Sequence, residues 1–192
     1  MEDKTTEELR NNFETAAQEL TRRTLVDPQM HQIPFPRGYI RRIEDLRPRW
    51  PYLTSDHQRN MACVCQLCDI NRWHLNTWKI SLTAGTMWEW QAALPVIAMM
   101  EHLIHGFGIR TGIFSENTNF KRAINKLHNA QVYKNQMRGE LHSHREFRNE
   151  VHLYLKGRVE MHDDKPKRYN KAVRTLRKLE GILLEQWNKR SL

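Results

Sequence analysis

Arginine and histidine recur at helical spacing between residues 138 and 152, where the chain reads RGELHSHREFRNEVH. Arg148 and His152 are four residues apart and would lie on one face of a helix, with Arg145 one turn earlier. An imidazole transfers protons near neutral pH, and a guanidinium beside it stabilises phosphate charge. The same arginines could equally form surface ion pairs with neighbouring glutamates, so both interpretations stay open.

The segment Phe147–Tyr154 resembles the active-site motif of the HEPN superfamily, in which four to six residues separate an Arg, usually followed by Asn, Asp or His, from a His. Arg148 is followed by an asparagine, but only three residues separate it from His152; six residues separate Arg145 from His152, but Arg145 is followed by a glutamate. The resemblance implies an all-helical, metal-independent ribonuclease acting as a dimer. His152 would be its general acid/base, and Arg145 or Arg148 would stabilise phosphate charge. Such a ribonuclease is our alternative functional prediction.

Three cysteines lie within six residues of one another. Cys65 and Cys68, with His74 and either Cys63 or His57, offer the sulfur and nitrogen ligands of a tetrahedral zinc site. All of them fall in one predicted helix, however, where Cys63 lies about 140° around the axis from Cys68. Buried free cysteine also packs as a small hydrophobic side chain. We therefore predict no metal and no cofactor, with zinc at these cysteines and His74 as the lesser alternative.

The chain carries a formal net charge of +9, from 31 basic and 22 acidic residues. Residues 1–114 hold 13 residues of each sign, whereas residues 115–192 hold 18 basic and 9 acidic residues and so carry the whole excess. Positive charge concentrated in one part of a chain attracts polyanions, with nucleic acid as our first expectation and an anionic membrane surface as the second. A basic surface that only keeps the protein soluble is the alternative.

Basic side chains of the predicted C-terminal helices lie off the apolar stripes of those helices. Such arrays suit phosphate contacts, which displace counterions and do not depend on base sequence. No helix-turn-helix, zinc-finger, RRM or KH signature accompanies them. The predicted nucleic-acid-binding residues are Lys121, Arg122, Lys126, Lys134, Arg138, Lys167, Arg168, Lys171, Arg174, Arg177 and Lys178.

The first predicted helix covers residues 5–24, where apolar residues recur every three or four positions. Thr5 and Glu8 form a capping-box pattern at its start. The stretch Val26–Tyr52 holds five of the seven prolines and cannot be one helix. We expect an ordered connection there, with a short turn at Ile40–Leu46.

Two further helices should follow, over residues 54–82 and Thr86–His105. The second of these is apolar on nearly all sides, which predicts a central helix covered by its neighbours. Pro95 should kink or split it, and Gly106 and Gly108 should end it.

A long apolar stripe runs from Phe120 to Tyr154 in steps of three or four residues, which predicts one helix of about nine turns after a cap at Ser115. Gly139 is its weakest point and a candidate break. A turn at His162–Asp164 then leads to the last helix. Asp164 would cap that helix, and Pro166 would lie in its first turn.

These patterns predict an all-α protein: a compact bundle of about five helices with a proline-rich ordered connection after the first helix. We expect one domain over residues 1–192, with a neutral, apolar-centred part (1–114) and a basic part (115–192). A homo-oligomer is expected, because Trp88, Trp90 and the methionine-rich third helix offer more apolar surface than so few helices hide.

Our primary functional prediction is a non-enzymatic protein that contacts RNA or DNA backbone, in the style of small viral nucleocapsid, matrix or accessory proteins. A protein–protein adaptor is a third possibility. The first residues are charged, and the longest apolar run, Ala92–Met100, is too short to span a bilayer. Together with the odd, clustered cysteines, this predicts a cytoplasmic or nuclear protein of a reducing compartment, without a transmembrane segment and not secreted.

Overall fold

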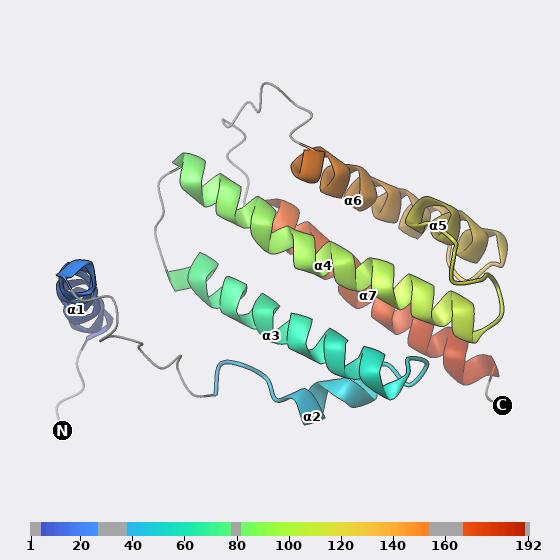
Figure 1. Cartoon of the computed structure of the whole chain (residues 1–192), viewed down its shortest axis with the longest axis horizontal. Helices are drawn as coiled ribbons and strands as arrows, with labels where there is room; N and C mark the ends of the chain where they lie inside the picture. Colours follow the sequence, from blue (N-terminus) through green and yellow to red (C-terminus); the bar gives the residue numbers. More distant parts are fainter. Residues whose placement is uncertain (1–4, 27–37, 78–81, 154–166, 191–192) are drawn as a thin grey trace. The chain divides into compact units, whose positions relative to one another are not determined.

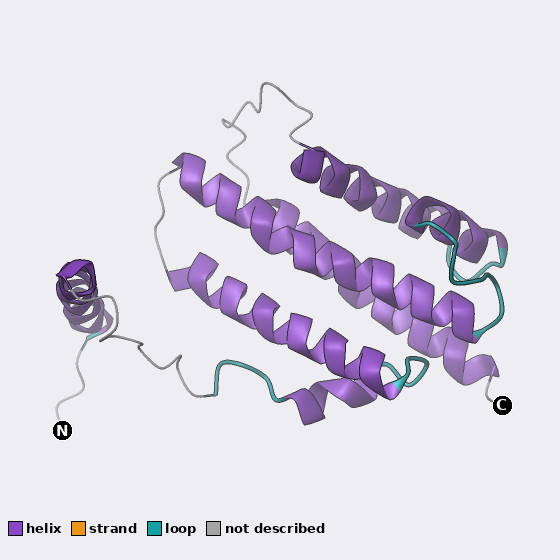
Figure 2. Ribbon diagram, in the orientation of Figure 1, coloured by secondary structure: helices purple, strands orange, loops and turns teal. Residues whose placement is uncertain are grey.

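The computed structural model describes residues 5–26, 38–77, 82–153 and 167–190. Within these residues it contains seven α-helices, one 3₁₀ turn and no strand (Figure 2), so the predicted all-α class is confirmed. The helices outnumber the expected five because a short one forms in the proline-rich connection and one predicted long helix is two. Chain contacts divide the protein into two compact units, Met1–Arg37 and Gly38–Leu192.

The first unit contains helix α1 (Thr6–Val26; Figure 1). The predicted capping box is confirmed: the N–H of Thr5 donates to Glu8 Oε2 at 2.8 Å, and the N–H of Glu8 donates to Thr5 Oγ1 at 3.3 Å. Arg22 and Glu19 form an exposed ion pair one turn apart, at 2.9 Å. The helix therefore starts where its local sequence predicts.

The second unit begins with the short helix α2 (Ile43–Leu46) and the 3₁₀ turn η1 (Arg47–Arg49). Trp50 and Tyr52 follow them and are fully buried, so the described part of the proline-rich connection is ordered by packing its aromatic side chains into the core. Helix α3 (Ser55–Thr77) starts next, at the predicted position.

Helix α4 (Leu82–Arg110) is the central helix of the second unit, and α3, α5, α6 and α7 all pack against it (Figure 1). Its prediction as a covered apolar helix is confirmed by its buried core positions. Pro95 lies inside one continuous helix and does not split it. The fully buried side chains of α4 include Ile97, Met100, Leu103, Ile104 and Phe107.

The predicted end of this helix at His105 is wrong, because α4 continues to Arg110. Gly112 ends it by adopting a φ of +70°, a left-handed conformation that glycine takes without steric cost. The N–H of Ile113 donates to the carbonyl of Gly108 at 2.9 Å, as in a Schellman motif.

Gly106 and Gly108 permit close packing instead of ending the helix. A Cβ atom on Gly106 would lie 2.1 Å from Leu53 Cδ2, and one on Gly108 would lie 2.1 Å from Phe114 Cζ. Tertiary contacts that the local sequence does not reveal therefore explain why glycine occupies these two positions.

The predicted nine-turn helix is also wrong, because it is two helices, α5 (Phe120–Asn129) and α6 (Asn135–Leu153). The break is not at Gly139, which lies inside α6, but at Gln131, whose φ is +58°. The N–H of Val132 donates to a carbonyl five residues earlier at 3.0 Å and closes the turn. The apolar spacing continues through this turn and gives no sign of it.

Helix α7 (Lys167–Arg190) lies along α4, with the predicted inner face buried at Tyr169, Leu176, Leu179 and Leu183. Glu89 of α4 accepts hydrogen bonds from the N–H groups of Arg168 (2.9 Å) and Tyr169 (3.1 Å) and so satisfies the first turn of α7. The predicted turn at residues 162–164, the Asp164 cap and Pro166 lie outside the described residues.

One stretch of the described residues, Ala84–Arg110, is long and apolar enough to cross a membrane by length and composition. More than half of its most apolar part is buried inside the bundle. That burial is typical of the central helix of a soluble protein, because the apolar side chains already have protein neighbours.

Candidate polyanion-binding site

The predicted nucleic-acid-binding residues lie on several surfaces and not on one wall. Arg174 and Arg177 of α7 line a cleft on the side of α3, whereas Lys178 of the same helix points to α6 and lies 3.4 Å from Glu140 Oε1. The basic face of α7 is therefore divided between two neighbours. The other exposed members lie on α5, before α6 and on α7: Lys121, Arg122, Lys126, Lys134 and Lys171.

Two of the predicted residues are engaged within the bundle. Arg138 Nε donates to Asn125 Oδ1 at 2.9 Å and joins α6 to α5. The guanidinium of Arg168 lies 4.7 Å from the ring centre of Phe147 and 6.0 Å from that of Trp90, as in cation–π contacts. The side chain of the remaining member, Lys167, lies outside the described part of the chain.

A cleft of about 390 Å³ lies between α3 and α7, with Val96 and Met99 of α4 among its lining residues. Basic side chains from four elements or connections meet there. Besides the two arginines of α7, the lining includes Arg41 before α2, Arg49 of η1 and Arg72 of α3.

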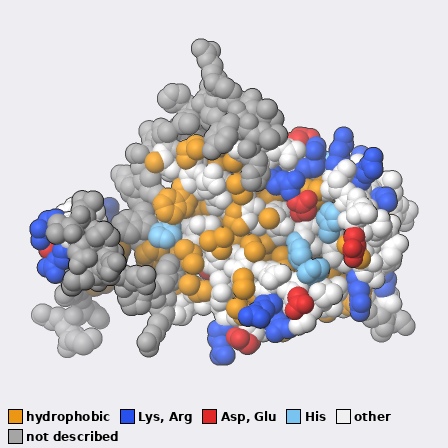
Figure 3. All heavy atoms as spheres, viewed as in Figure 1, with side chains coloured by type: hydrophobic (Ala, Val, Ile, Leu, Met, Phe, Trp, Pro, Cys, Tyr) orange, Lys and Arg blue, Asp and Glu red, His pale blue; other side chains and the backbone are white. Residues whose placement is uncertain are grey.

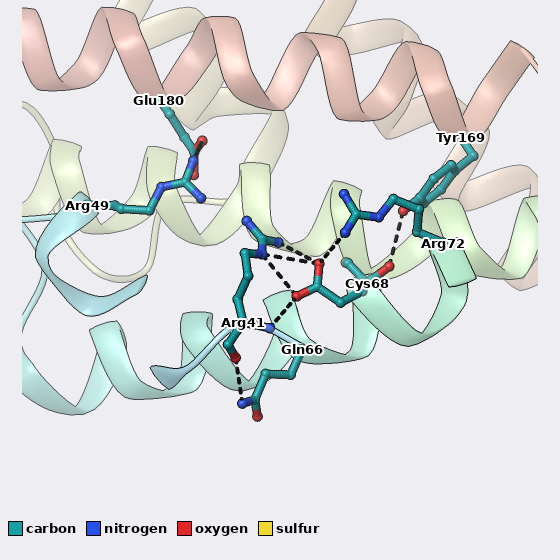
Figure 4. A network of polar contacts seen from close by, with 8 residues as sticks. Arg41, Arg49, Gln66, Cys68, Arg72, Tyr169 and Glu180 are labelled. Atoms are coloured by element: carbon teal, nitrogen blue, oxygen red, sulfur yellow. Dashed lines mark hydrogen bonds and ion pairs between the residues drawn. The ribbon is translucent and has the colours of Figure 1, made fainter. Parts of the chain in front are cut away.

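Asp69 of α3 fixes one side of this cleft. Its partners Arg41 and Arg72 are labelled in Figure 4. Its side chain is buried and accepts hydrogen bonds from Arg41 Nη2 at 2.9 Å and from the backbone N–H of Arg41 at 3.1 Å. Arg72 Nη2 lies 3.5 Å from the same carboxylate. The hydrogen bond from Arg41 to Asp69 raises the pKa of Arg41. Both guanidinium groups are thus held at the cleft by one buried anion.

Glu180 of α7 fixes the other side. Its carboxylate accepts a hydrogen bond from Arg49 Nη2 at 2.7 Å and another from Trp50 Nε1 at 2.8 Å. The side chain of Glu180 is only 12% exposed, whereas that of Arg49 is 38% exposed and reaches the solvent. They fasten η1 to α7 and orient the Arg49 guanidinium.

The cleft carries an excess of positive charge, because five arginines face two carboxylates and the lining therefore has a net charge of +3. Arg41, Arg49 and Arg72 interact with those two carboxylates. Arg174 and Arg177 form no ion pair with any carboxylate of the described residues, and both are exposed. Their charge is available to an anionic ligand.

Two cysteines also line the cleft, and both are neutral thiols at pH 7. Burial raises the pKa of Cys65 to about 11 and that of Cys68 to about 12. Cys63 is exposed and does not line the cleft, so the three thiols do not converge. Among the described residues, no group of three or more His, Cys, Asp and Glu side chains is placed to hold a metal ion. His74 lies between aromatic rings, 5.1 Å from Trp88.

Two arginines of the Arg/His segment, Arg145 and Arg148, pair with carboxylates. Arg148 contacts Glu101 of α4 and lies 5.6 Å from the ring centre of Phe120, and Arg145 lies 3.1 Å from Glu146 Oε1. The Arg145–Glu146 contact is an ion pair of the kind expected with neighbouring glutamates, whereas the partner of Arg148 lies on α4, outside the segment. The side chain of His152 lies outside the described residues, so its place relative to the two arginines is not part of the structure.

Sequence reasoning missed Arg41, Arg49 and Arg72. They belong to the first 114 residues, where basic and acidic residues balance, and no local spacing relates them to the last helix. The partial signal was that two of them, Arg41 and Arg49, belong to the proline-rich connection, which was expected to lie on the surface of the helices.

Comparison of the chain with protein-family models, with curated proteins and with solved structures found no match.

Proposed function

We propose that this protein is a non-enzymatic binding protein for the phosphate backbone of RNA or DNA, and that the cleft between α3 and α7 is its main contact site. The observation that carries the proposal is the pair Arg174 and Arg177, exposed at a cleft of net charge +3 and unpaired with any described carboxylate. The neighbouring arginines are already oriented by Asp69 and Glu180, so binding orders few additional side chains.

Arginine suits this role because its planar guanidinium donates two parallel hydrogen bonds to one phosphate. Each phosphate that is neutralised also releases condensed counterions, so the binding constant falls as salt rises. Such contacts do not distinguish bases, and the proposed binding is therefore independent of nucleic-acid sequence.

The test is fluorescence anisotropy with labelled RNA and DNA at about 50 and 200 mM salt, for the wild type and the double variant Arg174→Gln/Arg177→Gln. Each lost contact with a single strand lowers the salt slope by about 0.7, so the double variant should lose about 1.4. If the two proteins bind equally at about 1 M salt, this loss of slope corresponds to roughly 70-fold weaker binding by the double variant at about 50 mM salt.

The matched control is Arg59→Gln/Arg110→Gln. It also removes two positive charges, but from exposed positions on α3 and α4 outside the cleft. We expect it to bind nearly as the wild type does, and circular dichroism should show equal helix content in all three proteins. Absence of salt-dependent binding to any nucleic acid would overturn the proposal. Equal losses in the two double variants would overturn the cleft as the site.

The proposed setting is a reducing compartment, cytoplasmic or nuclear, where the three free cysteines stay reduced. We also propose self-association. Hydrophobic side chains gather on the face formed by α3 and α4 (Figure 3), and Leu67, Met87 and Ile109 are each more than a third exposed. Sedimentation at increasing protein concentration tests this, and a monomer throughout would contradict it.

A further inference from the structure

Both walls of the cleft are anchored on the central helix α4. Helices α3 and α7 both pack against α4, and the hydroxyl of Tyr169 on α7 donates to the carbonyl oxygen of Cys68 on α3 at 3.3 Å (Figure 4). The Arg49–Glu180 ion pair joins α7 to η1 in the same region. One side chain therefore spans from wall to wall and bounds the space between them.

The cleft volume of about 390 Å³ is near the lower end of the range for small-molecule sites. That volume suits one nucleotide. A duplex presents its phosphates on a rigid convex surface with the bases paired inside, so it can touch only the rim of such a cleft. An unpaired strand can turn a single phosphate, sugar and base inward.

The chemistry of the lining matches one nucleotide. Arg174 and Arg177 are three residues apart on α7, so both guanidinium groups can approach the same phosphate. The amide of Asn76, at the α3 wall, can both donate and accept hydrogen bonds. Leu75 and Val173, which are only partly buried, add apolar surface against which a base can pack.

We infer that the cleft binds one unpaired nucleotide of a single strand and excludes duplex. The inference rests on the proposed function and adds the class of nucleic acid that the site selects. The outer lysines of α5 and α7 are exposed and do not line the cleft, and they would contact either form of nucleic acid through its backbone alone.

The test compares a labelled single strand of about 16 nucleotides with a blunt-ended duplex of the same sequence, for the full chain at one salt concentration. We expect the wild type to bind the strand at least tenfold more tightly than the duplex, and Arg174→Gln/Arg177→Gln to lose most of that preference. Adenosine monophosphate should displace the strand at lower concentration than inorganic phosphate does. Asn76→Ala leaves the charge of the cleft unchanged. In this variant the concentrations of adenosine monophosphate and inorganic phosphate that displace the strand should differ less than in the wild type.

Salt-dependent binding of duplex and strand with equal affinity would overturn this inference and leave the proposed function standing. Displacement by inorganic phosphate as effective as that by the mononucleotide would also overturn it, because the site would then recognise phosphate alone. Failure to bind either nucleic acid would overturn the proposed function as well.

Discussion

His144 makes the stability of this protein depend on pH. It is buried between α6 and α7, where its Nε2 lies 3.1 Å from Thr175 Oγ1, and the Thr175 hydroxyl donates to Glu140 Oε2 at 2.9 Å. Because the threonine proton points to the carboxylate, the imidazole must donate to the hydroxyl oxygen. Burial lowers the pKa of His144 most and the positive charge of Lys171 lowers it further, so that the pKa is about 4.

The folded pKa of His144 is below its ordinary value of 6.5, so the unfolded chain takes up the proton first as the pH falls. The neutral imidazole therefore makes its full contribution to the free energy of unfolding above about pH 6.5, and this contribution is lost as the pH falls from about 6.5 to 4. At 1.36 kcal/mol per pKa unit, the loss is about 1.4 kcal/mol at pH 5.5 and about 3 kcal/mol at pH 4.

Urea unfolding at several pH values, compared between the wild type and His144→Gln, measures this effect. Glutamine can still donate to Thr175 but does not titrate in this range. The variant should be less stable at pH 7.5, and the free-energy difference between the two proteins should shrink by about 3 kcal/mol on acidification to pH 4. Parallel pH profiles would refute the reasoning, because the other titrating groups are the same in both proteins.

Three further predictions concern the bundle. Glu89→Ala should lower the free energy of unfolding by about 1–2 kcal/mol in urea titrations, because it leaves the first N–H groups of α7 without an acceptor; wild-type stability would show that water replaces the carboxylate. Gly106→Ala should destabilise the protein by about 1–3 kcal/mol, because the added Cβ would overlap a buried leucine. Gly139→Ala should stabilise it by about 0.5–1 kcal/mol, because the added Cβ meets nothing within 4 Å. Equal thermal midpoints of the two variants would contradict the packing argument. A thiol reagent at pH 8 should label exposed Cys63 in the native protein and the two buried cysteines of α3 only after unfolding, as mass spectrometry of the labelled protein would show; rapid native labelling of all three would contradict the burial.

Helix starts and buried faces were predictable because they depend on neighbours in the sequence. The Thr5–Glu8 capping box, the start of α3 and the inner face of α7 all follow from residues within one or two turns. Helix ends were predicted less well, since Gly106 proved to be a packing contact and Gln131 adopted a left-handed conformation without a glycine.

The sequence alone determined that this protein is helical and that its most apolar segment is the central helix. It also determined that the excess positive charge belongs to residues 115–192. Only the tertiary structure decided where that charge lies on the protein. It turned Arg174 and Arg177 toward α3 and brought three arginines of the balanced first part beside them. The physical reason is that α3 and α7 are joined through α4, and the sequence does not encode by spacing which flank of a helix meets which neighbour.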